Sequence, residues 1–443
     1  MSIDLIAESG VVGAGGAGFP THVKLSGRGD VVVVNAAECE PLLHKDKELI
    51  RLDTGRLIYG LSVAMKLAGA ERGIFGVKRK YVDVIEKLHS EIASNMEIIP
   101  LEDTYPAGDE LILIYETLGR IVPPGEIPIS VGAVVLNVET IFNISAAIEG
   151  VPVTEKYISV AGSVVNPSTI CVPIGTSLAD VIEAVGGVTI SEPAFVVGGA
   201  MMGYVELDLL KPVTKTTGGI IVLPKNHFVV QRKLWDWSRV VRVGRAACDQ
   251  CSFCTELCPR NLLGHPIEPH RAMRSLGFSE CAKSDVKGTQ FCSECNLCSY
   301  CSCPEGLDPR NVCAENKRRI LADIKKTGKR WENPPFRKER SSQHFRNRRT
   351  PTEKLIRKIG LANYVNKAPL KKNLLDVKRV VILLRQHIGA PAVPIVSCGD
   401  NIEKGDLIAR KNDSGIGANI HASISGKIAN ITNEAIEITK ENF

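Results

Sequence analysis

The chain has 443 residues, of which 44% are hydrophobic and 23% charged, a composition typical of globular proteins and a length that suits three or four domains. No apolar run approaches the roughly 18 residues that a membrane-spanning helix needs, so we expect no direct membrane span. No basic and apolar leader of the secretory kind opens the chain, so we expect a reducing cytoplasmic environment and no disulfides.

The first motif is a glycine-rich loop, GAGGAGFPT, at residues 13–21. Glycines let a backbone approach a phosphate or a flat ring closely, but this loop does not follow a strand as a dinucleotide-binding fingerprint does. Residues 30–35, DVVVVN, are typical of a buried strand, and polar residues follow it at Asn35, Glu38 and Glu40. Because α/β folds bind ligands at the carboxyl ends of strands, we expect a cofactor site here.

Four motifs in order resemble the FMN and NADH site of the flavoprotein subunit of respiratory complex I, and more closely that of RnfC, a component of the Rnf electron-transport complex. They are GAGGAGFPT, NAAECEP followed by KD, YPAGDE at 105–110 and NVET at 137–140. The resemblance implies a Rossmann-like FMN/NADH domain over residues 1–150, with the FMN phosphate at the glycine-rich loop. It also implies that Lys24 and Asn137 contact the flavin and that Glu38 and Glu40 lie near the flavin and nicotinamide. The cofactor-binding residues expected from it are Gly13, Gly15, Gly16, Gly18, Phe19, Lys24, Asn35, Glu38, Glu40, Tyr105, Gly108, Glu110, Asn137, Glu139 and Thr140.

The next region, residues 151–228, contains short β-branched strands, Gly and Pro turns, and one amphipathic helix from about Leu178 to Val185. Its motifs resemble the soluble-ligand-binding β-grasp (SLBB) domain of the same proteins. That module is structural in complex I, so we do not expect a small-molecule site in it.

Two cysteine runs between residues 248 and 304 predict two cubane 4Fe–4S clusters in a helical ferredoxin domain over residues 236–324. The first run has the bacterial spacing of three close cysteines and a fourth before a proline. In the second run the cysteine before the proline is Cys303, one residue late, and Cys301 lies between. Since the fourth cysteine of each run ligates the other cluster in two-cluster ferredoxins, we expect mixed ligand sets. These are Cys248, Cys251, Cys254 and Cys303 for one cluster, and Cys258, Cys292, Cys295 and Cys298 for the other.

Structural zinc is the weaker alternative, because a zinc site usually takes two separated cysteine pairs and here each run alone supplies four ligands. The choice between Cys301 and Cys303 as a ligand stays open.

Residues 325–372 contain 16 Lys and Arg against three Glu, a net charge of +13, so the rest of the chain carries −7. With two adjacent prolines and few large apolar residues, this stretch is typical of an exposed basic linker. No motif that reads a nucleic-acid groove accompanies this stretch, so we do not expect it to bind nucleic acid. A solvated connector, or one that steers an acidic electron-transfer partner, is the better hypothesis.

The last region, residues 373–443, has the short strands and Gly-Asp turns of a small β-fold. Its sequences RQHIGAPAVPIVSCGDNIEKGDLIA and IHASISGKI resemble the barrel-sandwich hybrid domain of RnfC, which usually begins that protein. The order of flavin, β-grasp, ferredoxin and barrel-sandwich domains resembles the PduS-type cobalamin reductases of propanediol-utilisation microcompartments.

The expected class is thus a multidomain α/β oxidoreductase that takes electrons from NADH and passes them through FMN and two 4Fe–4S clusters. The PduS resemblance implies a cobalamin acceptor, a corrinoid adenosyltransferase as partner, a microcompartment shell protein or a flavodoxin or ferredoxin as further partners, and a cytoplasmic place within a bacterial microcompartment. Two alternatives are a peripheral NADH-oxidising subunit of an Rnf-like membrane complex and an electron-wiring protein without NADH activity of its own. The sequence contains no cobalamin motif of the Asp-x-His-x-x-Gly kind.

Overall fold

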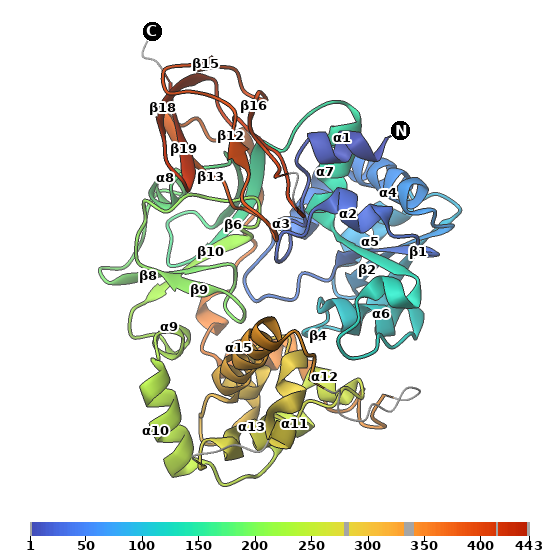
Figure 1. Cartoon of the computed structure of the whole chain (residues 1–443), viewed down its shortest axis with the longest axis vertical. Helices are drawn as coiled ribbons and strands as arrows, with labels where there is room; N and C mark the ends of the chain where they lie inside the picture. The colour runs from blue at the N-terminus through green and yellow to red at the C-terminus, as the bar shows by residue number, and fades with distance from the viewer. Residues whose placement is uncertain (1, 279–282, 332–340, 413–414, 441–443) are drawn as a thin grey trace.

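The structure is a computed structural model in which residues 2–278, 283–331, 341–412 and 415–440 are described. Figure 1 shows four parts: an N-terminal domain in blue and cyan, a β-grasp domain in green, a cysteine-rich domain in yellow and orange, and a C-terminal domain in red. The cysteine-rich domain lies at the opposite end of the molecule from the C-terminal domain, and the N-terminal and β-grasp domains lie side by side between them.

The N-terminal domain is a parallel sheet with helices on both faces. Its elements are α1 (Ile3–Glu8), α2 (Thr21–Ser26), β1 (Val31–Ala36), α3 (Lys45–Leu52), α4 (Thr54–Ala68), β2 (Arg72–Lys78), α5 (Val82–His89), β3 (Met96–Leu101), β4 (Thr104–Tyr105), α6 (Glu110–Leu118), η1 (Pro128–Val131), β5 (Ala133–Asn137) and α7 (Val138–Ile148). The strand order is β3-β2-β1-β5. Val32 and Val34 pack with residues of α4 and α7, whereas Val31 and Val33 pack with residues of α6. Because neighbouring side chains of a strand point to opposite faces, the four valines of β1 serve two helical layers.

The β-grasp domain is a six-stranded mixed sheet with one helix packed on it. Its elements are β6 (Glu155–Gly162), β7 (Ser168–Pro173), α8 (Leu178–Ala184), β8 (Pro193–Val197), β9 (Tyr204–Glu206), β10 (Gly219–Pro224) and β12 (Leu370–Leu374), in the order β12-β7-β6-β10-β8-β9. The helix expected from about Leu178 to Val185 is confirmed as α8. Strand β12 crosses the expected domain boundary at residues 372 and 373 and pairs with β7.

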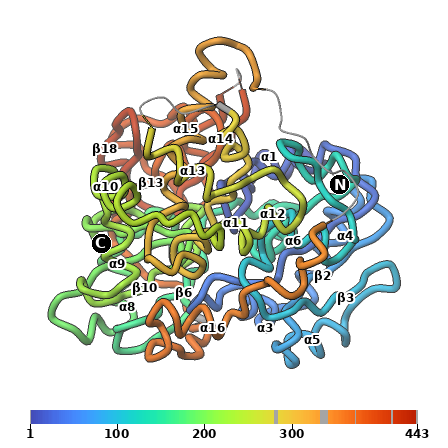
Figure 2. Tube along the Cα trace, turned by 90° about the horizontal axis from the view of Figure 1, so that it is seen from below, coloured from blue at the N-terminus to red at the C-terminus, as the bar shows by residue number. Residues whose placement is uncertain are grey.

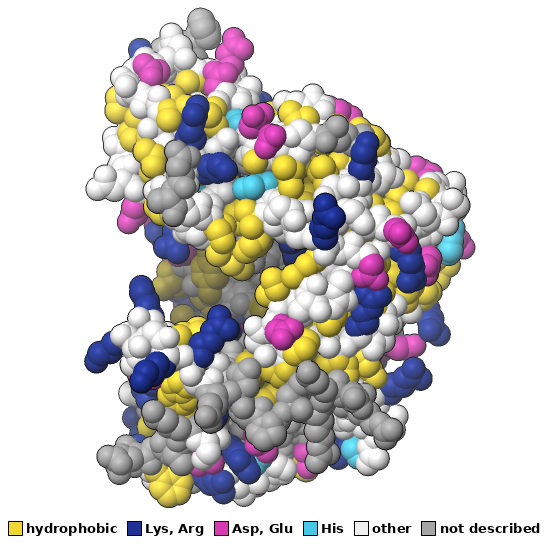
Figure 3. All heavy atoms as spheres, turned by 45° about the vertical axis from the view of Figure 1, so that its right-hand side comes forward, with side chains coloured by type: hydrophobic (Ala, Val, Ile, Leu, Met, Phe, Trp, Pro, Cys, Tyr) yellow, Lys and Arg dark blue, Asp and Glu magenta, His cyan; other side chains and the backbone are white. Residues whose placement is uncertain are grey.

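The cysteine-rich domain consists of short helices. They are α9 (Phe228–Lys233), α10 (Trp237–Ala247), α11 (Phe253–Glu256), α12 (Pro259–Leu262), α13 (Pro269–Ser275), α14 (Lys283–Val286), η2 (Lys287–Phe291), η3 (Cys298–Ser302) and α15 (Pro309–Thr327). A small core from α10, α13 and α15, which includes Val240, Met273 and Val312, supports the cysteine loops. In Figure 3, Lys and Arg side chains gather on the lower lobe beside the recess that separates it from the upper lobe.

The C-terminal domain has two small antiparallel sheets. Its strands are β13 (Arg379–Leu383), β14 (Val393–Pro394), β15 (Asn401–Ile402), β16 (Leu407–Arg410), β17 (Ile420–His421), β18 (Gly426–Ile431) and β19 (Ala435–Thr439), in the orders β13-β19-β18-β15 and β14-β16-β17. Buried residues of both sheets, such as Ile382, Ile408 and Ile436, belong to one core that continues into the N-terminal domain.

The larger described part of the basic segment, residues 341–372, differs from the exposed linker that the sequence suggested. It contains β11 (Thr350–Pro351), α16 (Thr352–Lys358) and η4 (Ala362–Tyr364), and β11 pairs with β4 of the N-terminal domain. Four of its large apolar residues, Phe345, Leu355, Ile359 and Leu361, are buried, whereas Val365 is exposed. Figure 2 shows this orange segment with α16 running between the N-terminal and β-grasp domains. The apolar side chains supply enough burial to pack the segment despite its charge.

Candidate cofactor sites

The glycine-rich loop connects α1 to α2 and lies against the NVET motif at the start of α7. The amide of Ala14 donates a hydrogen bond to Oγ1 of Thr140 (3.0 Å). A Cβ on Gly15 would lie 2.8 Å from the side chain of Asn137, whereas a Cβ on Gly16 would meet nothing within 4 Å. The loop is therefore in close contact with Asn137 at one glycine and borders open space at the next, as a loop that receives a ligand requires.

The other end of the loop is held by its own backbone and by the C-terminal domain. The amide of Gly13 donates to the carbonyl oxygen of Phe19 (2.9 Å), and the amide of Ile388 donates to that of Gly18 (3.2 Å). Gly18 has a φ of +74°, and a Cβ there would lie 3.0 Å from the carbonyl oxygen of Gln386. Glycine is thus required at residue 18 both by the left-handed backbone and by the close approach of the C-terminal domain.

A buried polar network lies next to Asn137. Nζ of Lys45 is 2.6 Å from Oδ1 of Asp46 and 3.0 Å from Oε2 of Glu139. The amide of the Asn137 side chain donates to Oδ2 of Asp46 (2.8 Å). Lys156, from the β-grasp domain, pairs with Glu139 and donates to a carbonyl oxygen of the glycine-rich loop (3.3 Å). Two ammonium groups therefore balance two carboxylates, and together they fix Asn137 and the loop.

The pKa values of this network follow from burial and pairing. Burial alone would raise the pKa of Glu139, but Lys156 and Lys45 outweigh it and hold the pKa below its usual range. Burial lowers the pKa of Lys156 to about 8, although Glu139 opposes the shift. Glu139 is therefore ionised at neutral pH, and its charge keeps Lys156 largely protonated.

A second set of predicted residues makes contacts of its own. Nζ of Lys24 lies 2.7 Å from Oε1 of Glu110, with both side chains partly exposed. The side-chain amide of Asn35 donates to the carbonyl oxygen of Gly108 (2.8 Å). A Cβ on Gly108 would lie 3.0 Å from Sγ of Cys39, so the YPAGDE segment lies against the end of β1.

The two predicted glutamates face different partners. The carboxylate of Glu38 accepts from the amide of Asp46 (2.8 Å) and from Nζ of Lys47 (2.9 Å). The carboxylate of Glu40 instead accepts from the amides of residues 201 and 202 of the β-grasp domain, at 2.9 and 2.8 Å. Glu38 is thus tied to the beginning of α3, whereas Glu40 joins two domains.

Two unpartnered polar atoms show that the loop suits a phosphate-bearing ligand. Oγ1 of Thr21 and Nδ1 of His22, directly after the glycine-rich loop, are buried and have no hydrogen-bond partner among the described residues. A hydroxyl and a ring nitrogen can donate to phosphate oxygens, and the open space at Gly16 lies in the same loop. These residues fit the phosphate end of FMN.

The fourth cysteine of the second run lies with the first run. Burial raises the pKa of Cys303, and the neighbouring thiols of Cys251 and Cys248 raise it further. Burial raises the pKa of Cys254 to about 12, and the first thiol that adds to this shift is that of Cys303. These four thiols therefore lie near one another, and Cys258 also lies close enough to Cys254 to raise its pKa.

The fourth cysteine of the first run lies with the second run. Burial raises the pKa of Cys258 to about 12, with Cys292 as the neighbouring thiol that adds to it. Cys258 in turn adds to the raised pKa of Cys295 and of Cys298.

Among the described residues no three His, Cys, Asp or Glu side chains are arranged to hold a single metal ion. A cubane binds each thiolate on a different iron, so its four sulfurs do not converge on one point.

Cys301 and Cys313 also lie in this region. Cys301 packs with Leu297 and Leu355 in an apolar cluster. Cys248 and Cys251 lie beside Cys303, and this placement favours Cys303 as the ligand. Cys313, which was not selected from the sequence, is hydrogen-bonded to Cys292, and this contact is the main cause that lowers the pKa of Cys292 to about 7. Its position on α15, outside both runs, left no signal in the spacing.

The N-terminal domain touches the second cysteine run directly. The hydroxyl of Tyr105 donates to the carbonyl oxygen of Cys295 (2.8 Å), and Arg260 pairs with Asp109 (2.9 Å). Predicted flavin-site residues and predicted cluster ligands are therefore in contact. Arg260 was not selected from the sequence, because a residue beside a ligand along the chain carries no sign of its partner in another domain.

Comparison with known families gives each part of the chain a relative. The family of the Nuo51 FMN-binding domain matches residues 6–146, SLBB residues 157–205, the 4Fe–4S dicluster domain residues 247–308, and the RnfC barrel sandwich hybrid domain residues 361–442. Cobalamin reductase PduS of Citrobacter freundii is 40% identical over 98% of this chain and 95% of its own length. The chain belongs to the PduS family. The Salmonella typhimurium PduS is 41% identical over 99% of this chain and 97% of its own length.

A more distant relative covers part of this PduS-family chain. One component of the Na⁺-translocating ferredoxin:NAD⁺ oxidoreductase complex of Acetobacterium woodii is 38% identical over 58% of the chain and 57% of its own length. These matches confirm the multidomain α/β class, the relation to RnfC and the complex I flavoprotein, FMN and 4Fe–4S clusters as cofactors, and an NADH-linked oxidoreductase. In the described part of the chain, the structure contains no helix with the length and apolar character to cross a membrane.

Proposed function

We propose that this chain reduces cobalamin, cob(II)alamin to cob(I)alamin, with electrons from NADH. The observation that carries the proposal is the similarity to PduS cobalamin reductases over 98% of the chain, including the C-terminal barrel-sandwich domain. The balanced reaction takes one NADH and two cob(II)alamin to NAD⁺, one proton and two cob(I)alamin. When bound, FMN exchanges two electrons with NADH and single electrons with iron–sulfur clusters.

Different residues of the N-terminal domain bind different parts of FMN and NADH. The main-chain amides of the glycine-rich loop and the hydroxyl of Thr21 hold the phosphate. Lys24 and Asn137 contact the flavin, and the buried pairs around Glu139 keep Asn137 in place. Glu38 lies on the nucleotide side. The proposed site comprises Gly13, Gly15, Gly16, Gly18, Phe19, Lys24, Asn35, Glu38, Glu40, Tyr105, Gly108, Glu110, Asn137, Glu139 and Thr140.

The two clusters take different positions in the proposed electron path. The cluster held by Cys258, Cys292, Cys295 and Cys298 is the proximal one, because Cys295 accepts a hydrogen bond from Tyr105 of the flavin site. The cluster held by Cys248, Cys251, Cys254 and Cys303 is the distal one. Its ligands include three partly exposed cysteines, which suits electron exit to an acceptor.

The surroundings of the reaction follow from the PduS relationship. We infer a cytoplasmic place within a bacterial microcompartment, a corrinoid adenosyltransferase that uses the cob(I)alamin, and a shell protein or a flavodoxin or ferredoxin as further partners. No nucleic acid takes part. The domain limits 1–150, 151–228 and 236–324 are part of this proposal, with β12 (Leu370–Leu374) added to the β-grasp domain.

Anaerobic reconstitution with iron, sulfide and FMN tests the proposal. NADH should bleach the flavin, reduce clusters that together contain about eight irons per chain, and then convert cob(II)alamin to cob(I)alamin in a two-to-one ratio. The Asn137→Ala variant should lose flavin and keep iron, whereas an exposed control, Lys404→Ala, should keep both. Reduced clusters without any cob(I)alamin would refute the corrinoid as acceptor.

The partial similarity to a component of an ion-translocating complex supports one second candidate, a peripheral NADH-oxidising subunit. Copurification with integral membrane subunits would favour it. Clusters that respond to a reduced ferredoxin but never to NADH would favour an electron-wiring role instead.

A further inference from the structure

We propose that residues 341–361, which we call the strap, hold the flavin site against the proximal cluster loop and so set the separation across which electrons leave the flavin. The inference rests on the proposed function, because it takes FMN to lie in the N-terminal domain. It gives a role to the basic segment, whose charge had suggested an exposed linker.

The first residues of the strap pack against helix α6 of the N-terminal domain. The ring of Phe345 packs edge-on against the ring of Tyr115, with centroids 4.8 Å apart. The Tyr115 hydroxyl and that of Ser341 share a hydrogen bond of 2.7 Å. Arg349 forms a two-pronged pair with Glu116, whose side chain is only 12% exposed. Planar double contacts of this kind fix direction as well as distance.

The strap then pairs with the backbone beside the flavin site. Thr350 is the strand partner of Tyr105 in the β11–β4 pair. The amide of Thr352 donates to the carbonyl oxygen of Asp103 (3.0 Å), and Oγ1 of Thr352 accepts from the buried Nζ of Lys78 (3.0 Å). The same Tyr105 donates to Cys295, so the strap supports the residue that touches the proximal cluster loop.

The strap finally packs on the cysteine-rich domain. Arg348 pairs with Glu256 at 3.3 Å, and Nζ of Lys358 donates to the carbonyl oxygen of Cys301 (2.5 Å). Leu355 and Ile359 are fully buried in one cluster with the cysteine loop. The strap therefore contacts the N-terminal and cysteine-rich domains in turn along a few residues.

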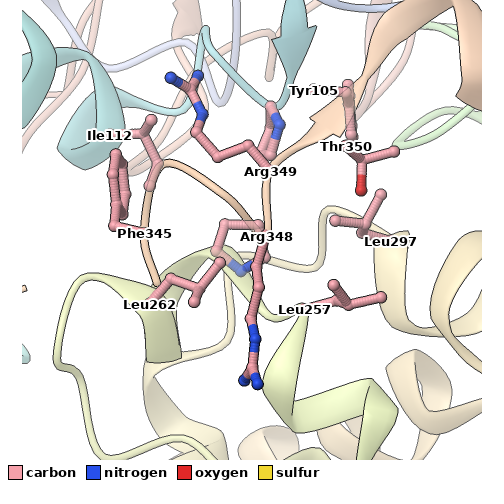
Figure 4. A pocket seen from close by; sticks show the side chains of 11 residues that line it. Tyr105, Ile112, Leu257, Leu262, Leu297, Phe345, Arg348, Arg349 and Thr350 are labelled. Atoms are coloured by element: carbon pink, nitrogen blue, oxygen red, sulfur yellow. The ribbon is translucent and has the colours of Figure 1, made fainter. Parts of the chain in front are cut away.

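Figure 4 shows the place where these contacts meet, a small apolar cavity lined by both domains and by the strap. Ile112 of α6 lies beside Phe345, and Leu257, Leu262 and Leu297 come from the cysteine-rich domain. The side chains of the two adjacent arginines point in opposite directions, Arg349 toward the N-terminal domain and Arg348 toward the cysteine-rich domain. A chain segment with alternate residues anchored on either side holds two domains at a fixed separation.

Fixed separation matters because electron tunnelling slows steeply with distance. Besides the strap, direct contacts between the flavin site and the proximal cluster loop are made by Tyr105 with Cys295 and by Asp109 with Arg260. Loosening the strap should therefore slow electron transfer from flavin to cluster while flavin reduction by NADH keeps its rate, since no strap residue belongs to the proposed nucleotide site.

The test compares Arg349→Ala with Arg357→Ala, which removes an exposed pair with Glu353 from the same segment. In the chain without cofactors, amide hydrogen exchange at residues 103–105 should rise in Arg349→Ala and not in Arg357→Ala. In anaerobic stopped flow of the reconstituted chain, flavin bleaching by NADH should keep its rate, and cluster reduction should slow by about tenfold or more in Arg349→Ala, as small displacements in reaction sites do. The charge-reversed pair Glu116→Arg with Arg349→Glu should recover part of that loss.

Unchanged cluster reduction in Arg349→Ala, despite faster exchange at residues 103–105, would overturn the proposal. Loss of flavin bleaching in that variant alone would also overturn it, because the strap would then serve the flavin site itself. Where Arg349→Ala does not fold, Leu355→Ala loosens the strap from the cysteine-rich side and is judged by the same two readouts. A wild-type chain whose flavin NADH does not bleach refutes the proposed function, and hydrogen exchange still decides whether the strap supports residues 103–105.

Discussion

The proposed flavin site and the proposed cluster sites of this chain differ in how their charges are balanced. At the flavin site, Lys45 and Lys156 neutralise Asp46 and Glu139 within hydrogen-bond distance, so the site is balanced before any cofactor arrives. At the cluster sites, burial raises the pKa values of thiols such as Cys254 and Cys258 to about 12. A thiol must lose its proton to ligate iron, so these sites depend on the metal for their charge balance.

One chain can therefore order its two redox sites by different means. The flavin site is fixed by protein contacts, and changes there should affect folding. The cluster sites are completed by iron, and changes there should affect metal content before they affect the rest of the fold.

Removing a proximal cluster ligand should have the largest effect. Cys258→Ala should lose one of the two clusters, so that iron falls from about eight to about four per chain, while bound flavin stays near one per chain. Iron, sulfide and flavin analysis with EPR of the reduced protein measures this. Cys303→Ala should lose the other cluster and Cys301→Ala should keep both. Loss of a cluster in Cys301→Ala but not in Cys303→Ala would show that Cys301 is the ligand.

Breaking the balanced network should destabilise the N-terminal half. Lys156→Met leaves the buried Glu139 with one ammonium instead of two, and removing one partner of a buried ion pair costs about 3–5 kcal/mol. Denaturant unfolding of the cofactor-free chain measures the change, followed by far-UV circular dichroism because all three tryptophans lie within residues 235–331. Lys404→Ala, which removes an exposed pair with Glu155, should cost less than about 1 kcal/mol. Equal losses for the two lysines would contradict a balanced site.

Lys215 differs from Lys45 and Lys156, because carbonyl oxygens rather than carboxylates accept hydrogen bonds from it. Its Nζ donates to the carbonyl oxygens of Gly10 (2.7 Å) and Asn419 (2.8 Å), so it links three domains behind the glycine-rich loop. Burial lowers its pKa to about 7. His387 and His421 face it, and burial lowers the pKa of each, so neither titrates above pH 7.

The titration of Lys215 should therefore make the free energy of unfolding rise with pH. Between about pH 7 and the unfolded value near 10.4, the unfolded chain binds the proton that the folded chain has lost, so the free energy of unfolding increases by up to about 1.4 kcal/mol per pH unit. A neutral amine still donates to both carbonyl oxygens. Unfolding of wild type and Lys215→Met at pH 7.5 and 9.5 checks the difference in slope. Parallel pH profiles would show that Lys215 stays charged in the folded chain.

The sequence predicted best those features that lie close together along it. Four consecutive valines mark β1 because only a strand covered on both faces buries them all, and the cysteine spacing marks the clusters because ligand geometry fixes it. Lys156, Arg260 and Arg349 were not found, since each meets its partner across a domain boundary and nothing near it in sequence changes with that contact.

The basic segment shows how composition can mislead. Its net charge and few large apolar residues predicted an exposed linker, yet Leu355 and Ile359 stand four residues apart, the spacing of one helix face, and both are buried. That local signal indicated α16. The partner surface on the cysteine loop depends on tertiary structure and had no sign in the sequence.

Replacing Glu40 should have the smallest effect on stability and activity, and the result tests whether Glu40 belongs to the nucleotide site. The resemblance placed it near the nicotinamide, whereas its buried carboxylate accepts from the amides of Met201 and Met202, and burial raises its pKa. Glu40→Gln keeps an oxygen that can accept one of these bonds, so we expect a loss of only about 1 kcal/mol in unfolding and an unchanged KM for NADH. Glu38→Gln is the matched change on the nucleotide side and should raise KM. A raised KM in Glu40→Gln with unchanged stability would mean that this carboxylate turns toward the nucleotide, and that its β-grasp contact gives way when NADH binds.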